Sequence, residues 1–169
     1  ASHRLDARVV LITGAAGDLG HAIVMRCRAS GARVAALDHA GDALRKRYAD
    51  HADVLLLECD ISNRDASFAA VEQVVAHFGA LHALVNNAAV PLRKPALEVT
   101  AAEWNTVIDT GLTGTFFMSQ QMGRHRVRQQ QAIATEHLRV SHDRPTGSHP
   151  AKTSGVAPFA AGRHAAMDN

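Results

Sequence analysis

Aromatic residues are scarce in this chain of 169 residues, which contains one Trp, one Tyr and five Phe. It has only two cysteines, Cys27 and Cys59, each among apolar neighbours and without the CxxC spacing of metal or redox sites. We therefore expect small buried thiols in a reducing compartment, with no disulfide and no bound metal. No apolar run reaches the length of a membrane span, and the first residues do not resemble a signal peptide. These absences predict a cytoplasmic globular protein that makes no membrane contact.

Charge of neither sign dominates, because the formal net charge is +2. The basic excess belongs to residues 123–169, which hold seven Lys or Arg and three Asp or Glu. Scattered charges without interleaved aromatic residues are typical of a solvated segment, so we predict no nucleic-acid binding. His137 and His142 lack a third ligand at helical spacing and do not indicate a metal site.

The most informative stretch is 9–24, VVLITGAAGDLGHAIV, where an apolar run leads into a glycine-rich turn and then a helical pattern. The run has no polar alternation, as in a parallel strand that is buried on both faces. Gly14 allows a tight reversal, and Gly20 lets the next helix lie close to the sheet. The helix start would offer free N–H groups to a diphosphate. The turn alone is equally compatible with a strand-to-helix loop that binds no ligand.

Apolar runs and helical patterns alternate through the first 122 residues, which predicts one α/β domain with a doubly wound parallel sheet. The helix at 18–30 is predicted to bury a stripe made of Leu19, Ala22, Ile23 and Cys27. Thr100 and Glu103 have the spacing of a capping box. An apolar stripe of the helix from residue 100 holds Trp104, Val107, Ile108, Leu112 and Phe116. The predicted strands are 8–13, 33–37, 54–57 and 81–85, and the predicted helices are 18–30, 42–50, 64–78 and the one from about 100.

Asp38 follows the second predicted strand, about 20 residues after the glycine turn. A carboxylate at that position accepts hydrogen bonds from ribose hydroxyls and repels a 2′-phosphate, which favours NAD over NADP. The alternative is an ordinary turn aspartate before Gly41.

The motifs together resemble the short-chain dehydrogenase/reductase (SDR) family over roughly residues 5–122. The matching pieces, in order, are TGAAGDLG at 13–20, Asp38, CDIS at 59–62, NNAA at 86–89 and TGLTGTFF at 110–117. The resemblance implies a Rossmann-type sheet with strand order 3-2-1-4 and a ligand crevice at the carboxyl ends of the first and fourth strands.

The same resemblance implies which residues would bind the cofactor NAD. Gly14 and Gly20 would line the diphosphate site together with Asp18 and Leu19, and Asp38 would hold the adenosine ribose. The adenine would be flanked by Asp60 and Ile61. Asn86, Asn87 and Ala88 would close the site beside the ribose.

Three departures from the family pattern affect function. Asp18 replaces the middle glycine of the turn; its carboxylate would suit a helix cap or a left-handed backbone, but it would oppose a diphosphate and weaken binding. Gly111 replaces the helix asparagine of the family's proton relay. The catalytic Ser and the YxxxK pair are missing, since the only tyrosine, Tyr48, lies far upstream. Ser148 and Lys152 share the SxxxK spacing, but an aliphatic hydroxyl is a poor proton donor or acceptor and Pro150 lies between them, so we assign no catalytic residue.

Residues 123–169 do not continue the α/β pattern, because only six of them are Leu, Ile, Val or Phe. We predict a poorly patterned tail, disordered or formed by the preceding helix running on toward Val140. The abrupt change after Met122 favours an aberrant or truncated C-terminus, as a frameshift or an alternative splice would produce.

The sequence therefore indicates an NAD-dependent oxidoreductase of an alcohol or carbonyl compound, by family, without turnover in this chain. The alternative is a noncatalytic NAD-binding or protein-interaction module. The helix at 100–122 resembles the family's dimer-forming helix, so a homo-oligomer is expected to form through it. The identity of the substrate is not encoded in any motif found here.

Overall fold

The computed structural model describes residues 4–142, and side chains through residue 132. Its sheet has four parallel strands in the order β3-β2-β1-β4, which confirms the predicted Rossmann-type doubly wound fold and strand order. The elements are β1 (Val9–Thr13), α1 (Asp18–Ala29), β2 (Arg33–Asp38), α2 (Gly41–Arg47), β3 (Leu55–Glu58), α3 (Arg64–Phe78), β4 (Ala83–Val85), η1 (Ala96–Glu98), α4 (Ala101–Ile108), the π-helical segment η2 (Asp109–Gly114) and α5 (Thr115–His142).

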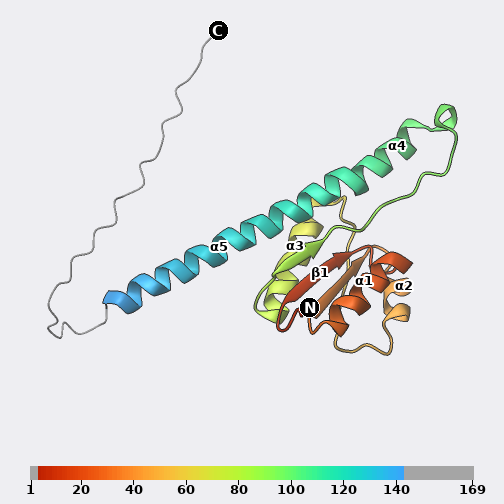
Figure 1. Ribbon diagram of the computed structural model, residues 1–169. Helices are drawn as coiled ribbons and strands as arrows, with labels where there is room; N and C mark the ends of the chain where they lie inside the picture. Colours follow the sequence, from red (N-terminus) through yellow and green to blue (C-terminus); the bar gives the residue numbers. More distant parts are fainter. Residues whose placement is uncertain (1–3, 143–169) are drawn as a thin grey trace, which may run out of the picture.

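Helices cover both faces of the sheet, so alternate side chains of β1 enter two separate cores. Leu11 lies in the core shared with α3, and Met118 of α5 completes that core. Ile12 lies in the other core, formed with α1 and α2, where Val24 and Leu44 are buried. Figure 1 shows α1 and α2 on one side of the sheet and α3 and α5 on the other. This arrangement explains why the strand has no polar alternation.

The buried face of α1 differs from the predicted stripe. Leu19 is 68% exposed and Ala22 is also exposed, whereas Gly20 and Val24 are buried. The helix is oriented by Gly20, whose missing side chain lets α1 rest on the carbonyl oxygen of Gly14. The assignment of Leu19 to the core was therefore wrong, and its side chain is available to a ligand.

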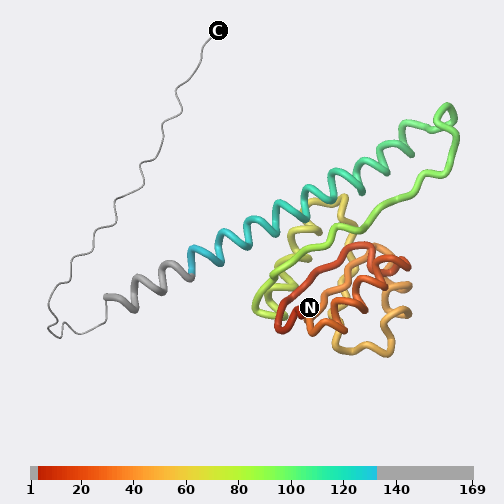
Figure 2. The backbone as a smooth tube through the Cα atoms, in the orientation of Figure 1, coloured from red at the N-terminus to blue at the C-terminus, as the bar shows by residue number. Residues whose placement is uncertain are grey.

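The predicted capping box starts α4: the Thr100 hydroxyl accepts from the Glu103 N–H, and the Glu103 carboxylate accepts from the Thr100 N–H. α4, η2 and α5 follow one another as a long rod that extends beyond the sheet (Figure 1). Figure 2 shows the backbone after β4 leading away from the sheet before this rod returns across it. The boundary that the sequence predicted after residue 122, between the α/β domain and its tail, falls inside α5, which runs to His142. The later tail, with Ser148 and Lys152, lies outside the described residues.

The rod is fixed to the sheet through α3. Glu72 of α3 accepts hydrogen bonds from the Gln121 amide and the Arg128 guanidinium of α5, each at 2.6 Å. Met118 is fully buried beneath these polar contacts. Although α5 has 28 residues, neither it nor any other helix within residues 4–142 has the length and apolar character needed to cross a bilayer.

Two histidines accept backbone hydrogen bonds at the ends of strands. The Nδ1 atom of His82 accepts from the Val9 N–H at 3.0 Å, and Nε2 of His125 accepts from the Leu81 N–H at 3.4 Å. A ring nitrogen accepts only when it carries no proton. Burial, and secondarily nearby arginines, lower the pKa of both rings.

Stability is therefore expected to fall as the pH drops below about 6.5, the ordinary histidine pKa. Below that value the unfolded chain binds protons that folded His82 and His125 resist, so protonation favours unfolding. Urea unfolding of the His125→Gln variant should show a weaker pH dependence than the parent. His77→Gln, which removes an exposed histidine from α3, is the control. Equal pH dependence in all three proteins would contradict the expectation.

Candidate dinucleotide site

The glycine turn between β1 and α1 requires glycine at both ends. Gly14 has φ +68, and a Cβ there would lie 2.8 Å from the Ala88 Cα. A Cβ on Gly20 would overlap the Gly14 carbonyl oxygen. These close approaches bring the start of α1 against the sheet, at the carboxyl end of β1, as the sequence predicted.

Three neighbouring elements hold this turn in place. From β2, the Asp38 carboxylate accepts from the Ala16 N–H at 2.9 Å. From the end of α2, the Tyr48 hydroxyl donates to the Ala15 carbonyl at 2.9 Å. From the loop after β4, the Asn87 amide donates to the backbone carbonyls of the turn. The turn is thus fixed before any ligand binds.

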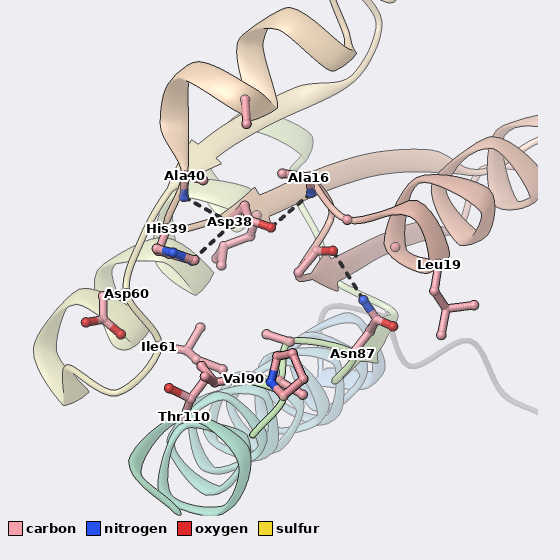
Figure 3. Close-up of a pocket in the computed structure, with 18 of the residues that line it drawn as sticks. Ala16, Leu19, Asp38, His39, Ala40, Asp60, Ile61, Asn87, Val90 and Thr110 are labelled. Carbon is pink, nitrogen blue, oxygen red and sulfur yellow. Dashed lines mark hydrogen bonds and ion pairs between the residues drawn. The ribbon is translucent and has the colours of Figure 1, made fainter. Parts of the chain in front are cut away.

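Asp38 is the most constrained acidic group of the site. It is 7% exposed, and besides Ala16 it accepts from the Ala40 N–H at 3.0 Å. The His39 ring lies 3.2 Å from the same oxygen as Ala40. Figure 3 shows this carboxylate between the end of β2 and the glycine turn. A carboxylate oxygen has two lone pairs, so the oxygen that accepts from Ala16 retains acceptor capacity for a hydroxyl.

Asp18 does not have the helix-capping role that the sequence suggested for it. Gly17 is the N-cap residue and has no side-chain cap, while Asp18 is already the first residue of α1. Its backbone is not left-handed either, since Ala7 is the one described residue other than glycine with a positive φ. The Asp18 carboxylate instead forms an ion pair with Arg47 of α2 at 2.9 Å. Its charge is therefore partly offset before a diphosphate arrives.

The predicted adenine-flanking pair follows β3. Ile61 is buried and lies directly beneath Gly114 of η2, where a Cβ would come within 2.7 Å of the isoleucine side chain. Asp60 is exposed, and its carboxylate accepts from the Ser62 N–H and hydroxyl. Figure 3 shows Asp60 and Ile61 on the side of the pocket near Thr110 of η2.

The two asparagines after β4 point to different places. Asn87 and Ala88 face the glycine turn, and their backbone N–H groups both donate to the Thr13 hydroxyl at 3.0 Å. Asn86 lies outside the pocket, because its amide donates to the Ser119 hydroxyl on α5 at 3.0 Å. Successive residues of extended chain face opposite sides, which separates Asn86 from its neighbours. Of the predicted cofactor-binding residues, Asn86 alone is not gathered at the pocket.

These residues surround a pocket of about 1080 Å³ at the carboxyl ends of the strands. Nine predicted residues line it: Gly14, Asp18, Leu19, Gly20, Asp38, Asp60, Ile61, Asn87 and Ala88. The sequence analysis missed other lining residues, among them Val90 and Arg93 of the loop after β4 and Thr106 and Thr110 of the rod. The strand order would have located the loop, because β4 pairs with β1 and both end at this edge. The two threonines depend on the path of the rod, which no motif specifies.

No tyrosine is among the described residues that line the pocket. Tyr48 is 2% exposed and its hydroxyl is bonded to Ala15, and burial raises its pKa to about 12. Gly111 lies in η2, and a Cβ there would meet no described atom within 4 Å. The tyrosine is therefore a structural support of the glycine turn.

The fold and the pocket define a doubly wound α/β protein with a pocket at the topological switch point between β1 and β4. The short chain dehydrogenase family matches residues 8–134. This chain belongs to that family.

Similar proteins include curated enzymes and solved structures. D-threitol dehydrogenase from Mycolicibacterium smegmatis is 36% identical over 125 residues, which cover 72% of this chain and 48% of the relative. 3-Ketoacyl-(acyl-carrier-protein) reductase from Brucella melitensis, solved with NADH, is 28% identical with a TM-score of 0.69, over 72% of this chain and 50% of the other. NAD+-bound xylitol dehydrogenase is 29% identical with a TM-score of 0.67, over 73% and 50%. The chain spans about half the length of these relatives.

Proposed function

We propose that this chain binds NAD(H) in the pocket and represents the cofactor-binding half of an oxidoreductase acting on a small alcohol or carbonyl compound. The proposal depends mainly on the environment of the Asp38 carboxylate. This group is nearly buried, is held by two backbone N–H groups and borders the glycine turn. Solved relatives with bound NADH and NAD+ support a nicotinamide dinucleotide as the ligand.

The residues of the pocket fit such a ligand in three places. The free N–H groups at the start of α1 suit a diphosphate, and the missing side chain at Gly14 lets the turn that leads to them lie against Ala88. Asp38 accepts from the adenosine ribose hydroxyls, and its negative charge disfavours the 2′-phosphate of NADP. Ile61 offers an apolar contact to the adenine. When bound, the nicotinamide would accept or supply hydride.

Among residues 4–132, the pocket has no counterpart of the phenol and the relay asparagine that the family pattern uses for proton transfer. The Tyr48 hydroxyl is hydrogen-bonded to the Ala15 carbonyl, and Gly111 has no side chain to hold a relay water. We therefore propose that the chain by itself binds the dinucleotide but does not turn over an alcohol.

Titration with NAD tests this function through thermal or urea unfolding. At a free NAD concentration near 100 Kd, the free energy of unfolding should rise by about 2.7 kcal/mol. NADH formation with a panel of alcohols should stay at the level without protein. No stabilisation at saturating NAD would disprove the binding, and turnover would disprove the noncatalytic assignment.

A second proposal concerns self-association through the rod. Trp104 is 58%, Leu112 66% and Phe116 56% exposed. Their spacings of eight and four residues place them near one side of a continuous helix. Large apolar groups gathered on one surface indicate an interaction site, and a second copy of the chain offers a matching surface.

Replacing Phe116 with Glu is expected to convert a dimer into a monomer, because a charge would be buried in the contact. Sedimentation velocity measures the mass of each species. Leu97→Glu is the matched control, since Leu97 is fully exposed on η1 and is not part of the rod. A parent chain that sediments as a monomer at all concentrations would refute the self-association.

A further inference from the structure

An ion pair joins the start of α1 to the end of α2. The Arg47 guanidinium donates to the Asp18 carboxylate at 2.9 Å. The Asp18 side chain is 97% exposed, whereas that of Arg47 is 33% exposed. The arginine is the more constrained partner, and it determines where the carboxylate lies.

Arg47 is held by its neighbour in the sequence. Tyr48 is buried, and its hydroxyl is bonded to Ala15 within the glycine turn. The backbone of α2 is therefore fixed against the turn one residue after Arg47. This attachment places the guanidinium beside the first turn of α1, where the proposed diphosphate would bind.

The pocket needs such a cation because its lining is acidic. Among the described residues, the pocket lining contains the three carboxylates of Asp18, Asp38 and Asp60 and only one guanidinium, that of Arg93. Asp18 alone stands at the diphosphate-binding end of α1. A free carboxylate there would turn toward two phosphate charges and repel them.

We propose that Arg47 is a positioning residue for dinucleotide binding, which holds the Asp18 carboxylate aside and offsets its charge. This inference rests on the proposed function. Cofactor affinity then depends on Arg47 only while position 18 carries a carboxylate. A purely structural ion pair would have no such dependence, and an exposed pair adds little to stability.

The test measures ADP-ribose affinity by calorimetry in four proteins: the parent chain, Arg47→Gln, Asp18→Asn and the double variant. ADP-ribose carries the diphosphate without the nicotinamide. Arg47→Gln should weaken binding about fivefold, the upper range for one partly exposed charge. In the Asp18→Asn background the same change should alter affinity less than about twofold, at physiological salt where more distant charges are screened.

Arg45→Gln is the matched control, because Arg45 lies on the same helix and pairs with Asp42 and Glu58 outside the pocket lining. It should leave the ADP-ribose affinity unchanged. Melting of the ligand-free variants shows whether the fold is intact.

Two results would overturn the inference alone. Equal weakening by Arg47→Gln in both backgrounds would mean that Arg47 contacts the phosphates directly. If the parent chain binds ADP-ribose and Arg47→Gln binds it with the same affinity, the ion pair is purely structural. If the parent chain binds neither ADP-ribose nor NAD, the proposed function fails as well.

Discussion

Gly20→Ala is expected to destabilise the fold by about 3 kcal/mol and to abolish NAD binding, because the added methyl group would overlap the Gly14 carbonyl oxygen. The neighbouring atoms are backbone atoms of the turn, and they have no rotamer by which to move away. Relief requires α1 to shift from the sheet, which separates its first N–H groups from the pocket. Urea unfolding and NAD titration measure the two effects.

Gly123→Ala provides the matched control for this substitution. Gly123 lies in α5, and a Cβ there would meet nothing within 4 Å among the described residues. Because alanine favours the helix, this variant should gain up to about 1 kcal/mol. Equal stability of Gly20→Ala and Gly123→Ala would contradict the close approach of α1 to the turn.

Asp38→Asn is expected to reduce the preference for NAD over NADP by roughly 30-fold, or about 2 kcal/mol. The parent carboxylate is nearly buried, so solvent screens its repulsion of a 2′-phosphate poorly. Asparagine keeps the size, but its one carbonyl oxygen accepts from only one of the Ala16 and Ala40 N–H groups, which bind different oxygens of Asp38. Calorimetric titration of each protein with both cofactors gives the ratio of affinities.

Asp60→Asn removes the same charge from the same pocket and serves as the control. Asp60 is exposed and bonded to Ser62, so water already screens its charge. Asp60→Asn should change the ratio of the NAD affinity to the NADP affinity by less than about threefold. A parent chain that binds NAD and NADP equally would show that Asp38 does not select the cofactor.

β1, β2 and β3 were predictable because each contains an apolar run that is followed closely by glycine or an acidic residue. β4 (Ala83–Val85) is shorter than the predicted 81–85, a range that His82 interrupts. β1 and β2 and the helix α3 lie within about a residue of their predicted limits. The stripe on α1 was not predicted correctly, although the glycine motif did predict the close approach of Gly20 to the sheet. Leu19 was assigned to the core on hydrophobicity, and the backbone contact of Gly20 turned it outward.

The site was predictable where a motif fixes a backbone path. Gly14, Asp38 and Ala88 are brought together because β1, β2 and β4 end at one edge of the sheet. Asn86 was misplaced, since its side chain takes the opposite direction to Asn87 and binds Ser119. The role of Tyr48 was missed, because its partner Ala15 is 33 residues away.

Hydrophobic periodicity, which acts locally along the chain, was enough to predict a right-handed parallel α/β sheet. The strand order and the location of the pocket came from the resemblance of the motifs to the family. The effective charge of the pocket, in contrast, depends on contacts that only the folded chain makes. Asp18 looked like an obstacle to a diphosphate, and its pairing with Arg47 from a different helix changes that interpretation. Electrostatic partners meet through folding of distant segments, so no local pattern in the sequence specifies them.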